Sequence, residues 1–278
     1  MQTSFDGVPE PARGLGLVGT LVIMAPCQRG LVLAADGRQT VAGVEHDGKR
    51  KLIQPKRTER TVVTVTGHGT FIPAPPSGAV TTDYLRNAPR LLDISAVVCA
   101  YLEERNVPVA ALDVLELSAR CGHALERYQQ ERPGALNGFT DREVFRVVLA
   151  GYEQANSEAV VRTFVVSWNG KQSASMISPN RHFDGDSAFD VLAYGETDFL
   201  NQHVYGGVGR QFLTKATIDL LLKPRPVAEV TLDEAVAAAK NIIGAASKAT
   251  AIVPAPTGIG GPVNVLLLSE ESRPRQLS

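Results

Sequence analysis

The order of its apolar segments constrains the fold of this chain most. Short β-branched runs at 20–26 and 31–36 are separated by Gln28-Arg29-Gly30, which indicates a β-hairpin. Two further runs, 50–54 and 61–67, are expected to complete an antiparallel sheet with them. The run at 61–67 alternates threonine and valine, so one of its faces should be buried and the other less so.

Two amphipathic helices are predicted after these strands. The first is capped by Asp93 and repeats apolar residues over 94–102, and the second repeats them over 117–128. Strands are then expected at 144–151 and 159–168, joined by a turn.

The rest of the chain repeats this arrangement of strands followed by helices. Asn169-Gly170 is a strong turn signal, and Thr231-Leu232-Asp233-Glu234 is a capping box that begins the last helix. Strands are expected at 172–177, 189–194 and 263–268, and a helical stretch at 198–222. Strands and helices that occur in groups favour an α+β fold, which two stacked sheets between two helical layers would satisfy.

Composition excludes several classes of protein. With 278 residues, of which 44% are hydrophobic and 21% charged, the chain is expected to form one large domain with its own core. A net charge of −1 gives no reason to expect nucleic acid or an anionic membrane as a partner, and no segment is long and apolar enough to span a bilayer. Three cysteines without metal or disulfide spacing suit a reducing cytoplasm, and neither a metal nor a cofactor is expected.

The first residues contain a misleading motif. Residues 14–19 match the glycine pattern G-x-G-x-x-G, and Asp36 lies where a ribose-binding acid would be expected. A dinucleotide site needs a strand before this pattern and a helix after it. Here a proline-containing leader precedes the glycines, and a β-branched run that includes Pro26 follows them, so this interpretation is disfavoured.

The same glycines favour a different interpretation, in which Thr20 is a hidden nucleophile. Small residues before Thr20 leave the Gly19–Thr20 bond accessible to its own hydroxyl, which would release residues 1–19 as a leader by an acyl shift. A threonine that becomes the first residue gains its own α-amine as a base. The predicted domains are therefore a leader, 1–19, and a hydrolase domain, 20–278.

Thr20, the segment Asp36–Thr40 and the pair Lys51-Leu52 together resemble the N-terminal signature of proteasome β-type subunits, which are N-terminal nucleophile hydrolases. The likeness is greatest to the bacterial branch, which includes the heat-shock-locus peptidase and the betaproteobacterial proteasome homologue. Gly67-His68-Gly69-Thr70 resembles the glycine turn after the family's fourth strand. The resemblance implies a four-layer αββα fold, cytoplasmic location, a double-ring homo-oligomer and threonine endopeptidase activity on polypeptides, with an ATP-dependent unfoldase as a possible partner.

The resemblance also implies roles for individual residues. Thr20 Oγ would attack the peptide carbonyl, the positive charge of Lys51 would lower the local pKa, and Asp36 would hold Lys51 in place. The backbone N–H at Gly67 would stabilise the oxyanion, and Thr40 would hydrogen-bond the main chain of an extended substrate.

Arg38 and Ser247 are expected to support the site, but the family pattern is not matched throughout. The spacing from Asp36 is one residue short, which makes Lys49 a rival of Lys51. The family's Ser after a late glycine is Glu196 here, and the last helix has Ala245 and Ala246 where an Asp is expected. Two alternatives therefore stay open: a catalytically silent ring subunit, and an N-terminal nucleophile amidase that acts on a small molecule.

Overall fold

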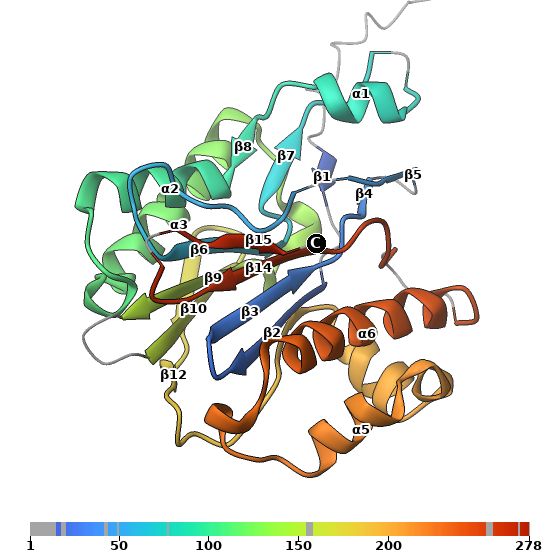
Figure 1. Cartoon of the computed structure of the whole chain (residues 1–278). Coiled ribbons are helices and arrows are strands. Elements are labelled where there is room, and N and C mark those ends of the chain that lie inside the picture. The colour runs from blue at the N-terminus through green and yellow to red at the C-terminus, as the bar shows by residue number, and fades with distance from the viewer. Residues whose placement is uncertain are drawn as a thin grey trace, which may run out of the picture.

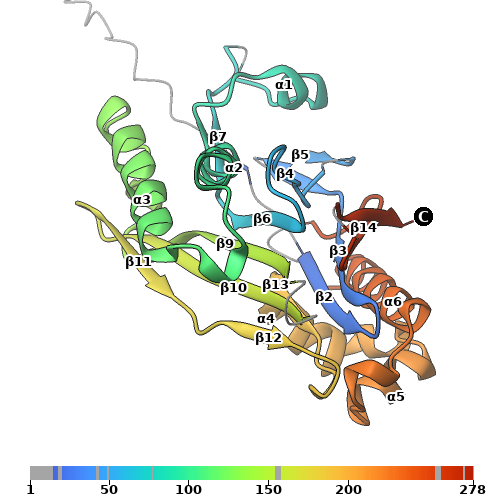
Figure 2. The same cartoon turned by 60° about the vertical axis from the view of Figure 1, so that its left-hand side comes forward.

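The computed structural model of the chain describes residues 15–17, 21–41, 44–48, 50–76, 78–153, 158–253, 258–271 and 273–277. Helices and strands are both abundant and occur in groups, so the fold is α+β, as predicted (Figures 1 and 2). No helix in these ranges is long and apolar enough to cross a membrane.

The first sheet is built around the predicted hairpin. Its five antiparallel strands lie in the order β13-β2-β3-β14-β15. The hairpin register pairs Val22 with Ala35 and Cys27 with Gly30. The turn therefore consists of Gln28 and Arg29, and Gly30, which was expected in the turn, is the first residue of β3. The strands are β2 (Leu21–Cys27), β3 (Gly30–Ala35), β13 (Leu192–Gly195), β14 (Asn264–Leu268) and β15 (Arg275–Leu277).

The second sheet is formed by the strands from the middle of the chain. Its order is β11-β10-β9-β6, and β12 pairs with β10 beside β11. The strands are β6 (Thr61–Gly67), β9 (Arg142–Glu153), β10 (Glu158–Trp168), β11 (Ser173–Ile177) and β12 (Arg181–Phe183). The predicted strands 144–151 and 159–168 are thus confirmed, and the turn between them lies partly outside the described residues.

Three apolar clusters bury both faces of the central strands of the two sheets. Side chains alternate along a strand, so Val22 of β2 belongs to a cluster that both sheets share, whereas Ile23 packs with the residues of α6 (Leu232–Thr250). The second sheet presents its other face to α2 (Ile94–Arg105) and α3 (Val114–Glu131). Double burial explains why β2 is apolar along its whole length.

The predicted helix starts are confirmed by their caps. The Asp93 carboxylate accepts a hydrogen bond from the N–H of Ala96, and Thr231 and Glu234 form the reciprocal capping box of α6. The stretch 198–222 is broken into short pieces, because the glycines near 206 bring the backbone close to the preceding turn. The pieces are α4 (Thr197–Phe199), a π-helical turn (Leu200–Tyr205), a 3₁₀ turn (Val208–Phe212) and α5 (Lys215–Leu222).

Two expectations about the early strands were wrong. Residues 50–54 form no strand, and only Ile53 makes a bridge, to Val63. The strand at 61–67 pairs with β9 in the second sheet instead of joining the hairpin. The first sheet covers the face of β6 that carries residues 62, 64 and 66, all of which are buried. Helix α2 covers the other face, where Val65 and Gly67 are half-buried, so one face is less buried than the other, as expected.

A small subdomain that the sequence did not reveal lies between β6 and α2. It contains β7 (Thr70–Ile72), α1 (Thr82–Asn87) and β8 (Leu92–Asp93), and β7 is flanked by β8 and by β1 (Leu15–Leu17). A two-stranded ribbon, β4 (Gln39–Val41) and β5 (Val44–His46), lies nearby (Figure 1).

Candidate active site

Asp36 is the centre of the candidate site and follows directly after β3. Its N–H donates to the carbonyl of Leu21 at 3.1 Å, and its Oδ1 accepts from the N–H of Leu21 at 2.7 Å. The first bond extends the β2–β3 ladder by one residue, and the second connects the Asp36 side chain to the backbone of β2. The hairpin therefore fixes the carboxylate beside the first described residue of β2, and the side chain is fully buried.

Lys51 reaches Asp36 from the segment that crosses between the two sheets. Lys51 Nζ lies 2.8 Å from Asp36 Oδ1, and the side chain of Lys51 is only 5% exposed. The next two residues hold this segment in place, because Leu52 is buried between the sheets and Ile53 bridges to Val63. A buried ion pair is tolerated when both charges are satisfied by hydrogen bonds.

Gly260 is a residue of the site that sequence reasoning missed. Its N–H donates to Asp36 Oδ2 at 3.3 Å, as does the N–H of Arg38, also at 3.3 Å. From the described residues, the carboxylate thus accepts four hydrogen bonds, one from a side chain and three from backbone amides. The signal that could have revealed this was the glycine-rich run at 258–261, after the last helix.

The loop that carries Gly260 packs closely on the backbone after Asp36. Gly37 donates its N–H to the carbonyl of Gly260 at 3.1 Å. A Cβ on Gly37 would lie 2.6 Å from the carbonyl oxygen of Pro262, so only glycine allows this approach. The loop thus supplies a backbone donor to the carboxylate in a chain whose last helix lacks the expected Asp.

Arg38 contacts the site through its backbone and supports the neighbouring ribbon through its side chain. Its guanidinium lies 2.8 Å from a carboxylate oxygen of Asp47 and 2.8 Å from one of Glu45. These two ion pairs connect the β4–β5 ribbon to the residue that precedes β4. The hydrogen bond from Arg38 lowers the pKa of the Asp47 carboxyl group.

The remaining predicted residues lie on other elements. Thr40 is on β4, and its Oγ1 is buried without a hydrogen-bond partner among the described residues. Gly67 ends β6 with φ +77°, and a Cβ there would lie 2.8 Å from the carbonyl oxygen of Val144. Ser247 is half-buried in α6. Within the described ranges, none of these three hydrogen-bonds Asp36.

Thr20 and Lys49 lie outside the described residues, and Leu21 is the first described residue after the proposed nucleophile. Of the lysine and arginine residues next to one another at 49–51, Arg50 is exposed and Lys51 is buried against Asp36. The structure therefore brings together Asp36, Lys51, the backbone of Arg38 and Leu21, and it adds Gly260.

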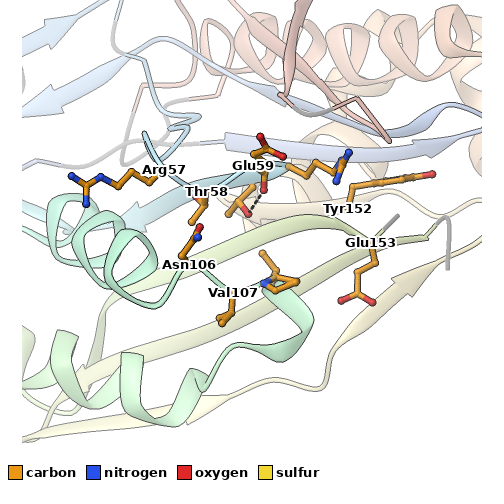
Figure 3. Close-up of a pocket in the computed structure, with 11 residues that line it drawn as sticks. Arg57, Thr58, Glu59, Asn106, Val107, Tyr152 and Glu153 are labelled. Atoms are coloured by element: carbon orange, nitrogen blue, oxygen red, sulfur yellow. Dashed lines mark hydrogen bonds between the residues drawn. The ribbon is translucent and has the colours of Figure 1, made fainter. Parts of the chain in front are cut away.

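Metal ligands do not gather anywhere in the described part of the chain, where no group of three or more His, Cys, Asp or Glu side chains is placed to hold an ion. A cavity of about 560 Å³ lies apart from Asp36, between the start of β6, the end of α2 and the end of β9 (Figure 3). No candidate site residue lines this cavity. Figure 3 shows that its wall mixes basic and acidic side chains, among them Arg57, Glu59 and Glu153.

Comparison with known proteins identifies no family for the chain. No protein-family model matches it, and no curated protein matches it. Among solved structures, the Anbu (Gly-1) mutant from Hyphomicrobium sp. strain MC1 is 16% identical with a TM-score of 0.44, over 94% of this chain and 87% of that chain. Anbu (ancestral beta-subunit) from Yersinia bercovieri gives the same four values.

A third similar structure is the helical assembly of the Anbu complex from Pseudomonas aeruginosa. It is 16% identical with a TM-score of 0.42, over 92% of this chain and 85% of that chain. Similarity at this level establishes neither a shared family nor a shared activity.

Proposed function

We propose that the chain is a self-processing N-terminal nucleophile hydrolase that cleaves peptide bonds with Thr20. One observation supports this most directly. Asp36 Oδ1 accepts a hydrogen bond from the N–H of the peptide bond between Thr20 and Leu21. The same oxygen accepts a hydrogen bond from the Lys51 ammonium group. The buried charge pair is therefore anchored to the backbone of the proposed nucleophile.

Self-processing would follow from the chemistry of a threonine beside a cation. The Thr20 hydroxyl attacks the carbonyl carbon of Gly19, a C–O bond forms, the C–N bond breaks, and the proton of the hydroxyl ends on the freed amine. Water then hydrolyses the ester, which releases residues 1–19 and leaves Thr20 as the first residue. Lys51 favours the hydroxyl in its ionised form because its positive charge stabilises the developing alkoxide.

Peptide hydrolysis would use the same atoms with the free α-amine as base. The amine takes the proton of the Thr20 hydroxyl as Oγ attacks the substrate carbonyl, and it returns this proton to the leaving amine. Water hydrolyses the acyl ester. In this proposal the Gly67 N–H binds the oxyanion, Thr40 binds the substrate main chain, and Arg38 and Ser247 support the site.

Self-association belongs to the same proposal. The two sheets and their helices are proposed as the four-layer αββα sandwich of a proteasome-like subunit, assembled into double rings. Strand β11 is the edge of its sheet and exposes Met176 and Ile177, which are 65% and 39% exposed. Leu115 at the start of the adjacent helix α3 is 68% exposed. Exposed apolar side chains at an unpaired edge support an interface there.

A threonine-directed covalent inhibitor tests the activity. A peptide epoxyketone is expected to form an adduct at Thr20 in the wild type and none in Thr20→Ala, as read by mass spectrometry. Leader-free protein that forms no adduct would instead identify a silent ring subunit. An adduct on a particle that light scattering shows to be monomeric or dimeric would favour the small-molecule amidase.

A further inference from the structure

Residues 15–17 of the proposed leader form the strand β1, and the space that this strand occupies beside β7 and β4 is called the channel below. β1 pairs with β7 in antiparallel register, with Leu15 opposite Ile72, Gly16 opposite Phe71 and Leu17 opposite Thr70. On its other side β1 lies beside β4, the strand that carries Thr40 (Figure 1). Residues 15–17 therefore run in extended form beside both the subdomain and the β4–β5 ribbon.

Glycine is the only residue type that the channel accepts at position 16. A Cβ on Gly16 would lie 2.4 Å from His68 Nδ1, which is closer than a carbon atom can approach. The imidazole cannot easily move away, because its ring lies edge-on to Phe139 at 4.6 Å and stacks at 6.3 Å on Phe71. His68 thus forms a floor beneath the main chain of β1.

Leu15 binds in an apolar cluster that belongs to the subdomain. Its neighbours in this satellite cluster come from β7, the following loop and α1: Ile72, Val80, Tyr84, Leu85 and Ala88. Helix α1 has no buried residue of its own. The satellite cluster therefore accepts a large aliphatic side chain one residue before the glycine.

The chemistry of the nucleophile connects this channel to substrates. In self-processing, the leader is the acyl group that Thr20 Oγ acquires from Gly19. A later substrate forms its ester with the same oxygen. Its acyl portion must therefore extend from that oxygen along the path that the leader occupied before its release. Gly16 is the fourth residue before the bond that is broken, and Leu15 is the fifth.

In the proposed function, a polypeptide substrate binds with its acyl side between β7 and β4; we infer that His68 restricts the fourth residue before the cleaved bond to glycine. Pairing with β7 supplies sequence-independent main-chain hydrogen bonds, and the satellite cluster selects a large aliphatic fifth residue. This inference rests on the proposed function for its link to catalysis, whereas peptide binding in the channel does not depend on it.

Binding is tested with the full chain carrying Thr20→Ala, so that the leader stays attached whether or not the chain processes itself. Gly16→Glu is added to expel β1, and the probe is a fluorescent peptide with the sequence of residues 10–19. We expect saturable binding, and about tenfold or weaker binding of the same peptide with alanine at position 16, because overpacking a fixed site is costly. Adding His68→Ala to the host should bring the two affinities within about twofold of each other.

Equal affinities of the glycine and alanine peptides for the host that retains His68 would overturn the inference, as would no saturable binding by a folded host. If Gly16→Glu fails to fold, Leu15→Asp replaces it, since an aspartate is expelled from the satellite cluster. The chain with Thr20→Ala and an intact leader is the control, and should bind the probe at least tenfold more weakly because β1 occupies the channel.

Cleavage separates this inference from the proposed function. If the wild type processes itself, peptides with glycine as the fourth residue before the cleaved bond should have kcat/KM about tenfold above their alanine counterparts, and His68→Ala should remove this preference. Processing without the preference would overturn the inference alone. Selective binding in a chain that never processes would overturn the proposed function alone.

Discussion

Lys51 Nζ and Asp36 Oδ1 are 2.8 Å apart, and their side chains are 5% and 0% exposed. Both charges have been taken out of water, and three backbone N–H groups also donate to the Asp36 carboxylate. Neutralising one member of the pair leaves the other charge buried without that counter-charge, which is far more costly than losing a surface ion pair.

The first prediction concerns stability. Asp36→Asn should lower the free energy of unfolding by about 3–5 kcal/mol, because Lys51 would stay buried without its counter-charge. Urea unfolding measures this change. Asp47→Asn is the matched control, since Asp47 is also 2.8 Å from a cation but is 48% exposed, and it should cost less than about 1 kcal/mol. Equal changes in the free energy of unfolding for the two variants would show that the buried pair stabilises the fold no more than the exposed one.

The second prediction identifies the basic residue that acts. Lys51→Met should slow release of the leader by about a hundredfold or more, because no cation would then stabilise the ionised hydroxyl of Thr20. Arg50→Ala and Lys49→Ala should leave the rate within about twofold. The rate is followed by intact mass over time after synthesis. A large loss in Lys49→Ala with none in Lys51→Met would reverse the assignment.

The third prediction concerns the loop that carries Gly260. Gly37→Ala should destabilise the fold by about 1–3 kcal/mol and slow release of the leader, because its Cβ would push Pro262 away and withdraw the Gly260 N–H from Asp36. Gly244→Ala, in open space on α6, should raise stability by up to about 1 kcal/mol. Unfolding and processing assays on both variants check this, and an unaltered Gly37→Ala protein would contradict the role of the loop.

The fourth prediction concerns pH. Burial lowers the pKa of His68 from 6.5 to about 4, so the folded chain holds this ring neutral where the unfolded chain protonates it. The stabilisation is complete above about pH 6.5 and is lost as pH falls towards 4, at no more than about 1.4 kcal/mol per pH unit for one proton. His68→Asn should reduce the slope of stability against pH in this window. Identical slopes in wild type and variant would show that His68 is not buried as a neutral ring.

Much of the fold was accessible from the sequence because it is encoded locally. Caps and apolar periodicity placed α2, α3 and α6, and Asn169-Gly170 marked the turn before β11. Which strands pair is decided over long distances, and the local pattern at 61–67 does not record that β9 becomes its partner.

The candidate site shows the same division. Asp36 and Lys51 are 15 residues apart, and their pairing was predicted by resemblance. Gly260 is 224 residues from Asp36 and acts through its backbone N–H, which every residue type except proline carries, so no side-chain pattern pointed to it. The strand β1 was missed because three residues become a strand only when a distant edge pairs with them.

The identity of the first residue in mature protein tests the central claim most directly. Intact mass and N-terminal sequencing of the purified chain should show loss of residues 1–19 and threonine at the new terminus, while Thr20→Ala retains the full leader under the same conditions. Peptidase activity in material that still carries the leader, or release of the leader from Thr20→Ala at the wild-type rate, would contradict the claim that Thr20 is the nucleophile.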